Sequence, residues 1–331
     1  MILPGDHPDS IARAVATLAA GELVALPTET VYGLAADAGR DDAVAKIFAA
    51  KGRPSDHPLI VHVPDAPSAT HFASSVPPVA QRLMDAFWPG PLTLILPRRA
   101  QAGAAAAGGQ ATIGLRCPAH PVAHALLLAC AQASPPILGL AAPSANRFGR
   151  VSPTMPAHVE SEFGASLLIL DGGACPVGIE SSIVDCTRGV PVLLRPGVLT
   201  REQIESACGE RLRDPLDMPD AAPRASGTLA SHYAPTAKVR LMPAGMLQTA
   251  LDVLGADAPR IGVYARTAIR ARGDSVRVRR MPDDAAETAR QLFAVLREFD
   301  DQQVRLIWVE PPPDEPAWDG VRDRLRRAAA G

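Results

Sequence analysis

Two short polar segments carry residue types that could handle a phosphate ester. Lys51 and Arg53 stand in KGR at the end of an expected helix, where a lysine can bind phosphate oxygens as a point charge and an arginine as a planar fork. Ser144 and Asn146 stand in PSAN, directly after an expected strand, and offer adaptable donors and acceptors. Cations also suit a helix C-terminus, and PSAN alone could be a turn. Taken singly, each segment favours the structural interpretation.

Arg116 could bind a carboxylate. It ends the apolar strand IGLR (113–116), where a charged group needs a partner. A substrate carboxylate could accept two parallel hydrogen bonds from it, but a structural Asp or Glu would serve equally well. The residues alone leave both possibilities open.

The elements that must position these residues are strands followed by polar loops. ELVAL (22–26) runs into PTETVYG (27–33), IGLR into Cys117-Pro118, and ILGLAA (137–142) into PSAN. In open α/β sheets, ligands bind beyond the carboxyl ends of strands. We therefore expect a ligand site at these strand ends, although PTET and PSAN could each be no more than helix caps and turns.

Strand and helix patterns alternate over the first two hundred residues, and several strands are too close together for parallel crossovers. We expect an α/β fold with a twisted mixed sheet. Residues 209–234 are rich in Pro, Asp, Ala and Gly, which indicates a linker. The expected domains are a catalytic domain at 1–208, a linker or lid at 209–235 and a smaller Rossmann-like α/β domain at 236–331.

The composition narrows the function classes. The chain has 331 residues, of which 47% are hydrophobic and 21% charged, with a formal net charge of −2. This charge argues against a broad basic surface for nucleic acid. The five cysteines form no CxxC pair and the N-terminus resembles no signal peptide, so we expect a cytoplasmic protein. The absence of GxxxxGK[ST] and GxGxxG excludes a P-loop and an ordinary dinucleotide fingerprint.

Several motifs in order resemble the threonylcarbamoyl-AMP synthase family, whose catalytic unit is the YrdC-like domain. They are PTETVYGL, KIFAAKGRPSDHPLIVH, WPGPLTLIL, LRCPAHP, APSANRFGRVSPT, DGG, GIESSIVD and LLRPG. They cover nearly all of residues 10–205, and HYAP (232–235) resembles the longer, two-domain members of the family.

The resemblance implies a concave, cationic cleft and specific residue roles. The expected catalytic residues are Lys51, Arg53, Ser144 and Asn146. The expected ATP contacts are Arg53, His57, Thr112, Ser144, Ser152, Arg195 and Tyr233, and the expected L-threonine contacts are Thr30, His62, Arg116, Ala142 and Ser181. Two departures stand out: His57 replaces a common Asn or Lys, and SGTLASHYAP replaces a commoner PGMKYRHYAP.

The resemblance also implies a reaction and its partners. Threonine and bicarbonate would give a carbamate that attacks the α-phosphate of ATP, with Mg²⁺ accompanying the nucleotide and with tRNA threonylcarbamoyl-transfer machinery as recipient of the product. We expect Lys51 to be exposed at its helix end and Tyr233 to close over the nucleotide. The rival interpretations are a double-stranded-RNA-binding module and the carbamoyl-transfer role of YrdC-like domains in hydrogenase maturation proteins.

Overall fold

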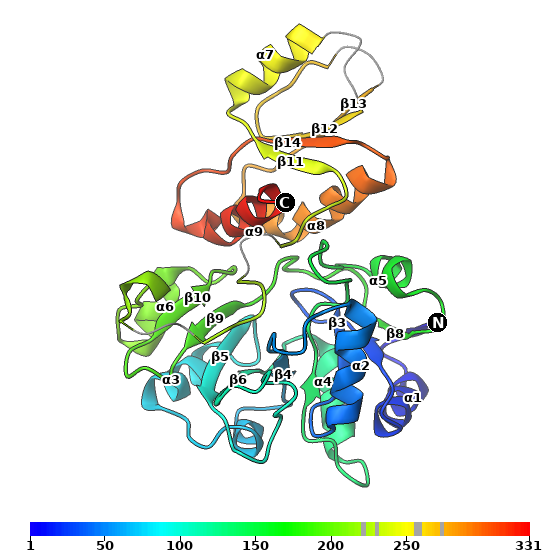
Figure 1. Ribbon diagram of the computed structural model, residues 1–331, viewed down its shortest axis with the longest axis vertical. Coiled ribbons are helices and arrows are strands. Elements are labelled where there is room, and N and C mark those ends of the chain that lie inside the picture. The colour runs from blue at the N-terminus through cyan, green and yellow to red at the C-terminus, as the bar shows by residue number, and fades with distance from the viewer. Residues whose placement is uncertain (220–222, 229–231, 255–259, 272–274) are drawn as a thin grey trace. The chain divides into compact units, whose positions relative to one another are not determined.

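The chain divides into two compact units in its computed structural model, which describes residues 1–219, 223–228, 232–254, 260–271 and 275–331. The first unit comprises Met1–Phe148 and Ser152–Thr228, and the second comprises Gly149–Val151 and Leu229–Gly331 (Figure 1). Most of the segment expected to be a linker therefore belongs to the first unit. Residues 220–222 and 229–231 of that segment lie outside the described residues.

The first unit is built on a mixed sheet, as expected from the sequence. The strand order is β1-β8-β2-β3-β7-β4-β6-β5-β9-β10. Parallel pairs such as β4 with β6 occur beside antiparallel pairs such as β5 with β6. The strands are β1 (Ile2–Pro4), β2 (Val24–Leu26), β3 (Gly33–Asp37), β4 (Ile60–His62), β5 (Leu92–Pro97), β6 (Thr112–Arg116), β7 (Leu140–Ala141), β8 (Leu168–Asp171), β9 (Ser182–Asp185) and β10 (Val192–Arg195).

Helices of the first unit bury two separate apolar clusters. Leu18 of α1 and Leu126 of α4 belong to one cluster, whereas Ile47 of α2, Leu83 of α3 and Ile204 of α6 belong to the other. The helices are α1 (Pro8–Ala19), α2 (Asp41–Lys51), α3 (Pro78–Phe87), α4 (Pro121–Ala131), α5 (Pro156–Phe163) and α6 (Arg201–Cys208), with short 3₁₀ turns η1 (Pro67–His71) and η2 (Pro215–Asp217). The sheet is thus covered from more than one side, which holds its strand ends rigidly.

The helix that carries Lys51 has clear start and stop signals. Asp41 and Asp42 lie in the first turn of α2, where acidic residues suit the helix dipole. Gly52 follows Lys51 in the left-handed conformation, with φ of 63°, and this conformation ends a helix at little steric cost only for glycine. Arg53 therefore leaves the helix axis directly after Lys51.

The second unit is a four-stranded parallel sheet in the order β11-β14-β12-β13. Its strands are β11 (Lys238–Leu241), β12 (Ile261–Ala265), β13 (Val276–Arg280) and β14 (Leu306–Val309), and its helices are α7 (Ala244–Leu254), α8 (Ala285–Asp301), η4 (Pro316–Trp318) and α9 (Asp319–Ala329). Leu247 of α7 packs in one cluster with Val263, whereas Phe299 of α8 fits against the neighbouring Gly262. Successive residues of a strand face opposite sides, so α7 and α8 cover opposite faces.

Some strands differ from the sequence prediction. The strand expected at 137–142 is reduced to β7, while β1, β3 and β13 were not expected. The segment Gly33–Asp37 consists mainly of small residues with low strand propensity, and it forms a strand because β2 and β7 pair with it on both sides. No helix among the described residues is long and apolar enough to cross a membrane.

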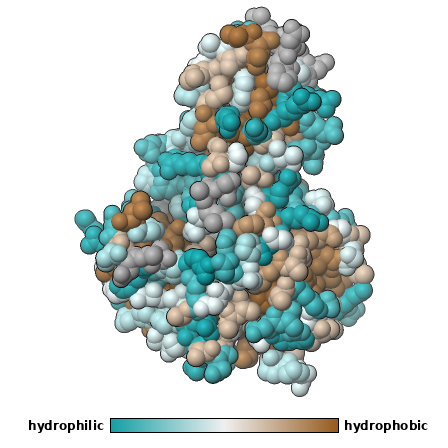
Figure 2. Space-filling view, in the orientation of Figure 1, coloured by the Kyte–Doolittle hydropathy of each residue, from teal (hydrophilic) through white to brown (hydrophobic). Residues whose placement is uncertain are grey.

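Hydrophobic side chains also gather on one surface of the first unit near α2 and α5 (Figure 2). A hollow of about 570 Å³ there is lined in part by Leu23, Phe163 and Leu167, together with Arg13 and Lys46. None of the predicted site residues lines it.

Candidate active site

The predicted polar residues follow the ends of neighbouring strands. β4 and β6 run parallel, and His62 lies opposite Arg116 at their carboxyl ends. PTET follows β2, and Ala142 and Ser144 follow β7. The backbone N–H of Ala142 donates to Ile60 O at 3.0 Å, which ties this loop to β4. Because β7 runs antiparallel to β4, Ala142 lies beside the start of β4, whereas His62 and Arg116 lie at the carboxyl ends of β4 and β6.

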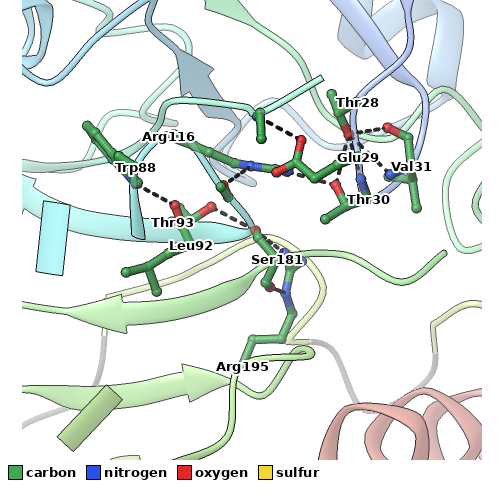
Figure 3. A network of polar contacts seen from close by, with 12 residues as sticks. Thr28, Glu29, Thr30, Val31, Trp88, Leu92, Thr93, Arg116, Ser181 and Arg195 are labelled. Carbon is green, nitrogen blue, oxygen red and sulfur yellow. Dashed lines mark hydrogen bonds and ion pairs between the residues drawn. The ribbon is translucent and has the colours of Figure 1, made fainter. Parts of the chain in front are cut away.

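Arg116 lies at the centre of a buried polar network (Figure 3). Its Nη1 donates to Thr30 Oγ1 at 2.8 Å, its Nη2 to Glu29 Oε1 at 2.5 Å, and its Nε to Gly90 O at 3.2 Å. The side chains of Arg116 and Glu29 are only 5% and 9% exposed. Of the two partners left open by the sequence, the structural glutamate is therefore present. Sequence reasoning missed Glu29, although it stands in the PTET motif.

A second chain of contacts lies beside Arg116 and joins three strands. Ser181 Oγ lies 2.8 Å from Thr93 Oγ1 of β5 and accepts a hydrogen bond from Arg195 Nη2 at 3.2 Å (Figure 3). Arg195 Nε also donates to Ser181 O at 3.0 Å. Two predicted residues with different expected roles, Ser181 for threonine and Arg195 for ATP, thus touch each other.

His62 is buried and neutral. Burial, followed by the nearby Arg116 charge, lowers the pKa of His62 to about 3. Its Nδ1 has no hydrogen-bond partner among the described residues. An unpartnered buried nitrogen is costly, which fits a position that receives a polar ligand group.

Lys51 is buried, and the expectation of an exposed helix end was wrong. The residue is 3% exposed, and Nζ donates to Ser144 O at 2.6 Å and to Asn146 O. Burial, assisted by the Arg53 charge, lowers the pKa of Lys51 well below its usual value. The side chain turns inward because the PSAN loop packs on the end of α2 and offers two carbonyl oxygens. KGR and PSAN, ninety residues apart, therefore form one cluster.

Arg53 lies beside that cluster. Its Nη2 donates to Pro58 O at 2.9 Å and to Ser226 Oγ at 3.2 Å, and its guanidinium lies 5.6 Å from the centre of the Phe148 ring. The half-buried His57 packs edge-on against the same ring at 5.5 Å. Burial, then Arg53, lowers the pKa of His57. His57 therefore adjoins the cationic group although its residue type departs from the family pattern.

Residues 223–228, which we call the strap, contact several predicted ATP residues. Ser226 O accepts a hydrogen bond from Arg195 Nη1 at 2.8 Å. Arg224 pairs with Asp56, and its backbone N–H donates to Gln110 Oε1 at 2.8 Å. The cavity beside Thr112 has a volume of only about 10 Å³. Ser226 was not predicted from the sequence, because a serine in a Pro/Ala/Gly-rich segment carries no distinguishing signal.

The remaining predicted residues are placed as follows. Ser152 is fully buried and donates its hydroxyl to Glu180 Oε1. Asn146 Nδ2 donates to Arg147 O at 2.8 Å. Tyr233 belongs to the second unit, where its buried ring stacks on Phe293 at 5.6 Å and lies under the Arg324 guanidinium at 5.2 Å. Its expected contact with the nucleotide stays a prediction.

Fold and site together define an α/β protein with a mixed sheet and with buried cationic side chains, among them those of Lys51, Arg116 and Arg195. The sequence model described as "Telomere recombination" matches residues 16–197, and the one described as "Threonylcarbamoyl-AMP synthase, C-terminal domain" matches residues 199–330. The chain belongs to the threonylcarbamoyl-AMP synthase family.

Relatives match over almost the whole chain. The threonylcarbamoyl-AMP synthase of Bacillus subtilis is 38% identical, with 97% of this chain and 93% of that protein covered. The enzyme of Pyrococcus abyssi is also 38% identical, over 93% of this chain and 91% of its own. The solved structure of Pyrococcus abyssi Sua5 complexed with L-threonine superimposes with a TM-score of 0.88 at 36% identity, covering 99% of this chain and 97% of that one.

Proposed function

We propose that this protein is an L-threonylcarbamoyladenylate synthase, a nucleotidyltransferase. It would form threonylcarbamoyl-AMP and pyrophosphate from L-threonine, bicarbonate and ATP. The observation that carries the proposal is the pair of polar groups, the buried Arg116 network and the Lys51 and Arg53 cluster, in a chain whose full-length relatives bear this enzyme's name. The closely similar structure complexed with L-threonine supports threonine as one substrate.

The Arg116 network suits the threonine end of the reaction. A guanidinium at a buried strand end binds a carboxylate through parallel, charge-assisted hydrogen bonds. Neutral His62 and the hydroxyl groups of Thr30 and Ser181 supply further polar contacts nearby. Burial strengthens each of these contacts because little water competes for them.

The Lys51 and Arg53 group suits the phosphates. The carbamate oxygen would attack the α-phosphate and pyrophosphate would leave, so two negatively charged groups must approach each other. Cations placed in advance offset that repulsion, and positioning supplies most of the remaining rate. Lys51 has three N–H donors and gives two to backbone carbonyls, so one remains for a phosphate oxygen.

Mg²⁺ is proposed to arrive with ATP. Among the described residues, no group of three or more His, Cys, Asp or Glu side chains could hold a metal ion. We propose that phosphate oxygens hold the ion, where it would neutralise charge on the leaving pyrophosphate. We also propose that the product serves tRNA threonylcarbamoyl transfer in the cytoplasm.

The deciding experiment is mass-spectrometric detection of threonylcarbamoyl-AMP from the purified protein. We expect product only when L-threonine, bicarbonate and MgATP are all present, and none when any one is omitted. Absence of product in the complete mixture would reject the proposal. Salt-sensitive retention of double-stranded RNA, without synthesis, would instead favour the RNA-binding alternative.

A further inference from the structure

We infer that Glu29 is a positioning residue, which holds the Arg116 guanidinium in the orientation that binds the threonine carboxylate. The inference rests on the proposed function and adds to it the residue that sets threonine affinity. Glu29 itself touches Arg116 through Oε1 at 2.5 Å and is not expected to react.

A donor count shows what Arg116 has left for a ligand. A guanidinium has five N–H donors. The protein uses three of them, one each on Nε, Nη1 and Nη2. Within the described part of the chain, five minus three leaves two, one on each terminal nitrogen. Two parallel donors are what a bidentate carboxylate requires, so the protein contacts orient the fork and leave its binding edge available.

Glu29 is well suited to orient another side chain because it is itself held at both ends. Its Oε2 accepts the backbone N–H of Ala119 at 3.0 Å, and its backbone carbonyl accepts the N–H of Val177 at 2.8 Å. The neighbouring Thr28 Oγ1 accepts the N–H groups of Thr30 and Val31, both at 3.2 Å. Hydrogen bonds thus fix the turn that carries Glu29 and Thr30, as Figure 3 shows. Because Arg116 donates to both residues, the turn also fixes the position of its guanidinium.

Charge gives a second reason for the role of Glu29. Burying an isolated guanidinium to this degree would carry a large desolvation free energy. The Glu29 carboxylate offsets that cost before threonine arrives, so Arg116 can stay at the strand end in the absence of ligand. A pre-organised donor loses less freedom when it binds, and this favours affinity.

The informative substitution is Glu29→Gln. Arg116 and the Ala119 N–H contact different oxygens of the Glu29 carboxylate. In glutamine one of these two positions is an NH2 donor, so one of the two contacts and the negative charge are lost while the side-chain volume is kept. A matched control exists in the same unit. Asp185 is another fully buried acid paired with an arginine, Arg188, at 2.9 Å, and Asp185→Asn removes an equivalent ion pair away from Arg116.

Titration calorimetry on the full chain tests the inference with threonine and with MgATP. We expect Glu29→Gln to weaken threonine binding about tenfold to a hundredfold, as loss of a well-aligned charge-assisted hydrogen bond does, and to change ATP affinity by less than about threefold. Asp185→Asn should change neither. In an Arg116→Met background, Glu29→Gln should add less than about threefold, because its effect passes through Arg116.

Other results would overturn the inference. Wild-type threonine affinity in Glu29→Gln would do so, as would equal losses of threonine and ATP binding or fully multiplicative effects with Arg116→Met. If Glu29→Gln does not fold, Glu29→Asp keeps the charge but withdraws the carboxylate by one methylene, and wild-type threonine affinity there would overturn it too. Synthesis by the wild type distinguishes failure of the Glu29 inference from failure of the proposed function. If the wild type makes product and the Glu29 variants bind threonine normally, only the role of Glu29 is rejected.

Discussion

At the scale of single residues, the site depends on charged side chains placed where water is largely excluded. Lys51, Arg116 and Arg195 are each less than 5% exposed, and each spends part of its donor capacity on the protein. A substitution at any of the three removes protein contacts as well as a charge, so the test variants must separate an effect on stability from an effect on synthesis.

Lys51→Met tests the phosphate role with the side-chain length largely kept. We expect synthesis to fall by about a hundredfold or more, since a placed charge is lost. Stability should also fall by about 1–3 kcal/mol, because two carbonyl oxygens of the PSAN loop lose their donor. Turnover and urea unfolding measure the two effects separately.

The control for Lys51 lies on the same helix. Lys46 of α2 is 41% exposed and pairs with Glu22 at the surface, so Lys46→Met should leave synthesis unchanged and stability within about 1 kcal/mol. Near wild-type synthesis by folded Lys51→Met would show that its charge is dispensable.

His62 predicts a pH dependence of stability. Its pKa falls from 6.5 to about 3 on folding, so between these values the unfolded chain binds a proton that the folded chain does not. Stability is therefore complete above pH 6.5 and is lost as the pH falls toward 3. Between about pH 7.5 and about pH 5 the loss from this residue should be about 2 kcal/mol.

The measurement is urea unfolding of the wild type and of His62→Gln at both pH values. Other groups titrate in both proteins, so the difference between their pH slopes isolates His62. The variant should show the flatter slope, and equal slopes would contradict the assignment.

At the scale of elements, residues 210–219 and 223–228 are an integral part of the first unit. Leu212 is 5% exposed within the main apolar cluster. Arg213 N–H donates to Pro191 O, and Leu193 N–H donates to Arg213 O, both at 2.9 Å. The strap then reaches Arg53 and Arg195 through Ser226. Ser226 therefore uses donors of two arginines that are predicted to bind ATP.

Two shortened chains test this assignment of residues 210–228. A chain that ends at Gly209 loses the buried Leu212 and the two backbone hydrogen bonds, whereas a chain that ends at Thr228 retains them. The shorter chain should be less stable by about 3 kcal/mol or more, as measured by chemical unfolding. Leu212→Ala in the full chain isolates the apolar part, with an expected loss of about 2–5 kcal/mol. Equal stability of the two shortened chains would show that the segment is a passive tether.

At the scale of the whole molecule, the loop after the PSAN motif belongs to both units. Asn146 and Ser152 are in the first unit, but residues 149–151 between them are grouped with the second. Ala234 N–H donates to Gly149 O at 2.9 Å, and Arg150 pairs with Asp300, which also accepts the N–H groups of Thr236 and Ala237. These contacts hold residues 149–151 within the second unit, and in the chain these residues stand between Asn146 and Ser152.

We expect a chain that ends at Thr228 to fold but to lose synthesis by about tenfold or more, because the loop that positions Asn146 and Ser152 is released. Asp300→Ala in the full chain should give a smaller loss of the same kind. Asp301→Ala is the matched control, since the neighbouring Asp301 is exposed. Full synthesis by the Thr228-terminated chain, with its first unit folded, would remove any such role for the second unit.

The sequence by itself determined the α/β class, most helices and strands, and the motifs that identify the family. These follow from local patterns: apolar periodicity, helix-end signals such as Asp41 in the first turn of α2 and Gly52 after its last residue, and polar residues directly after strands. A strand such as Gly33–Asp37 escaped notice because its own residues do not favour one. It forms because β2 and β7 supply backbone hydrogen-bond partners on both sides.

Only the tertiary structure decided which distant groups meet. Glu29 and Arg116 are 87 positions apart, and Arg53 and Ser226 are 173 apart. Whether Arg116 meets a protein acid, or whether Lys51 turns into the protein, depends on the strand order and on the packing of loops against helix ends. Those depend on the whole chain at once, because a buried charge takes whichever partner the fold brings within hydrogen-bond distance, and no local pattern encodes that distance.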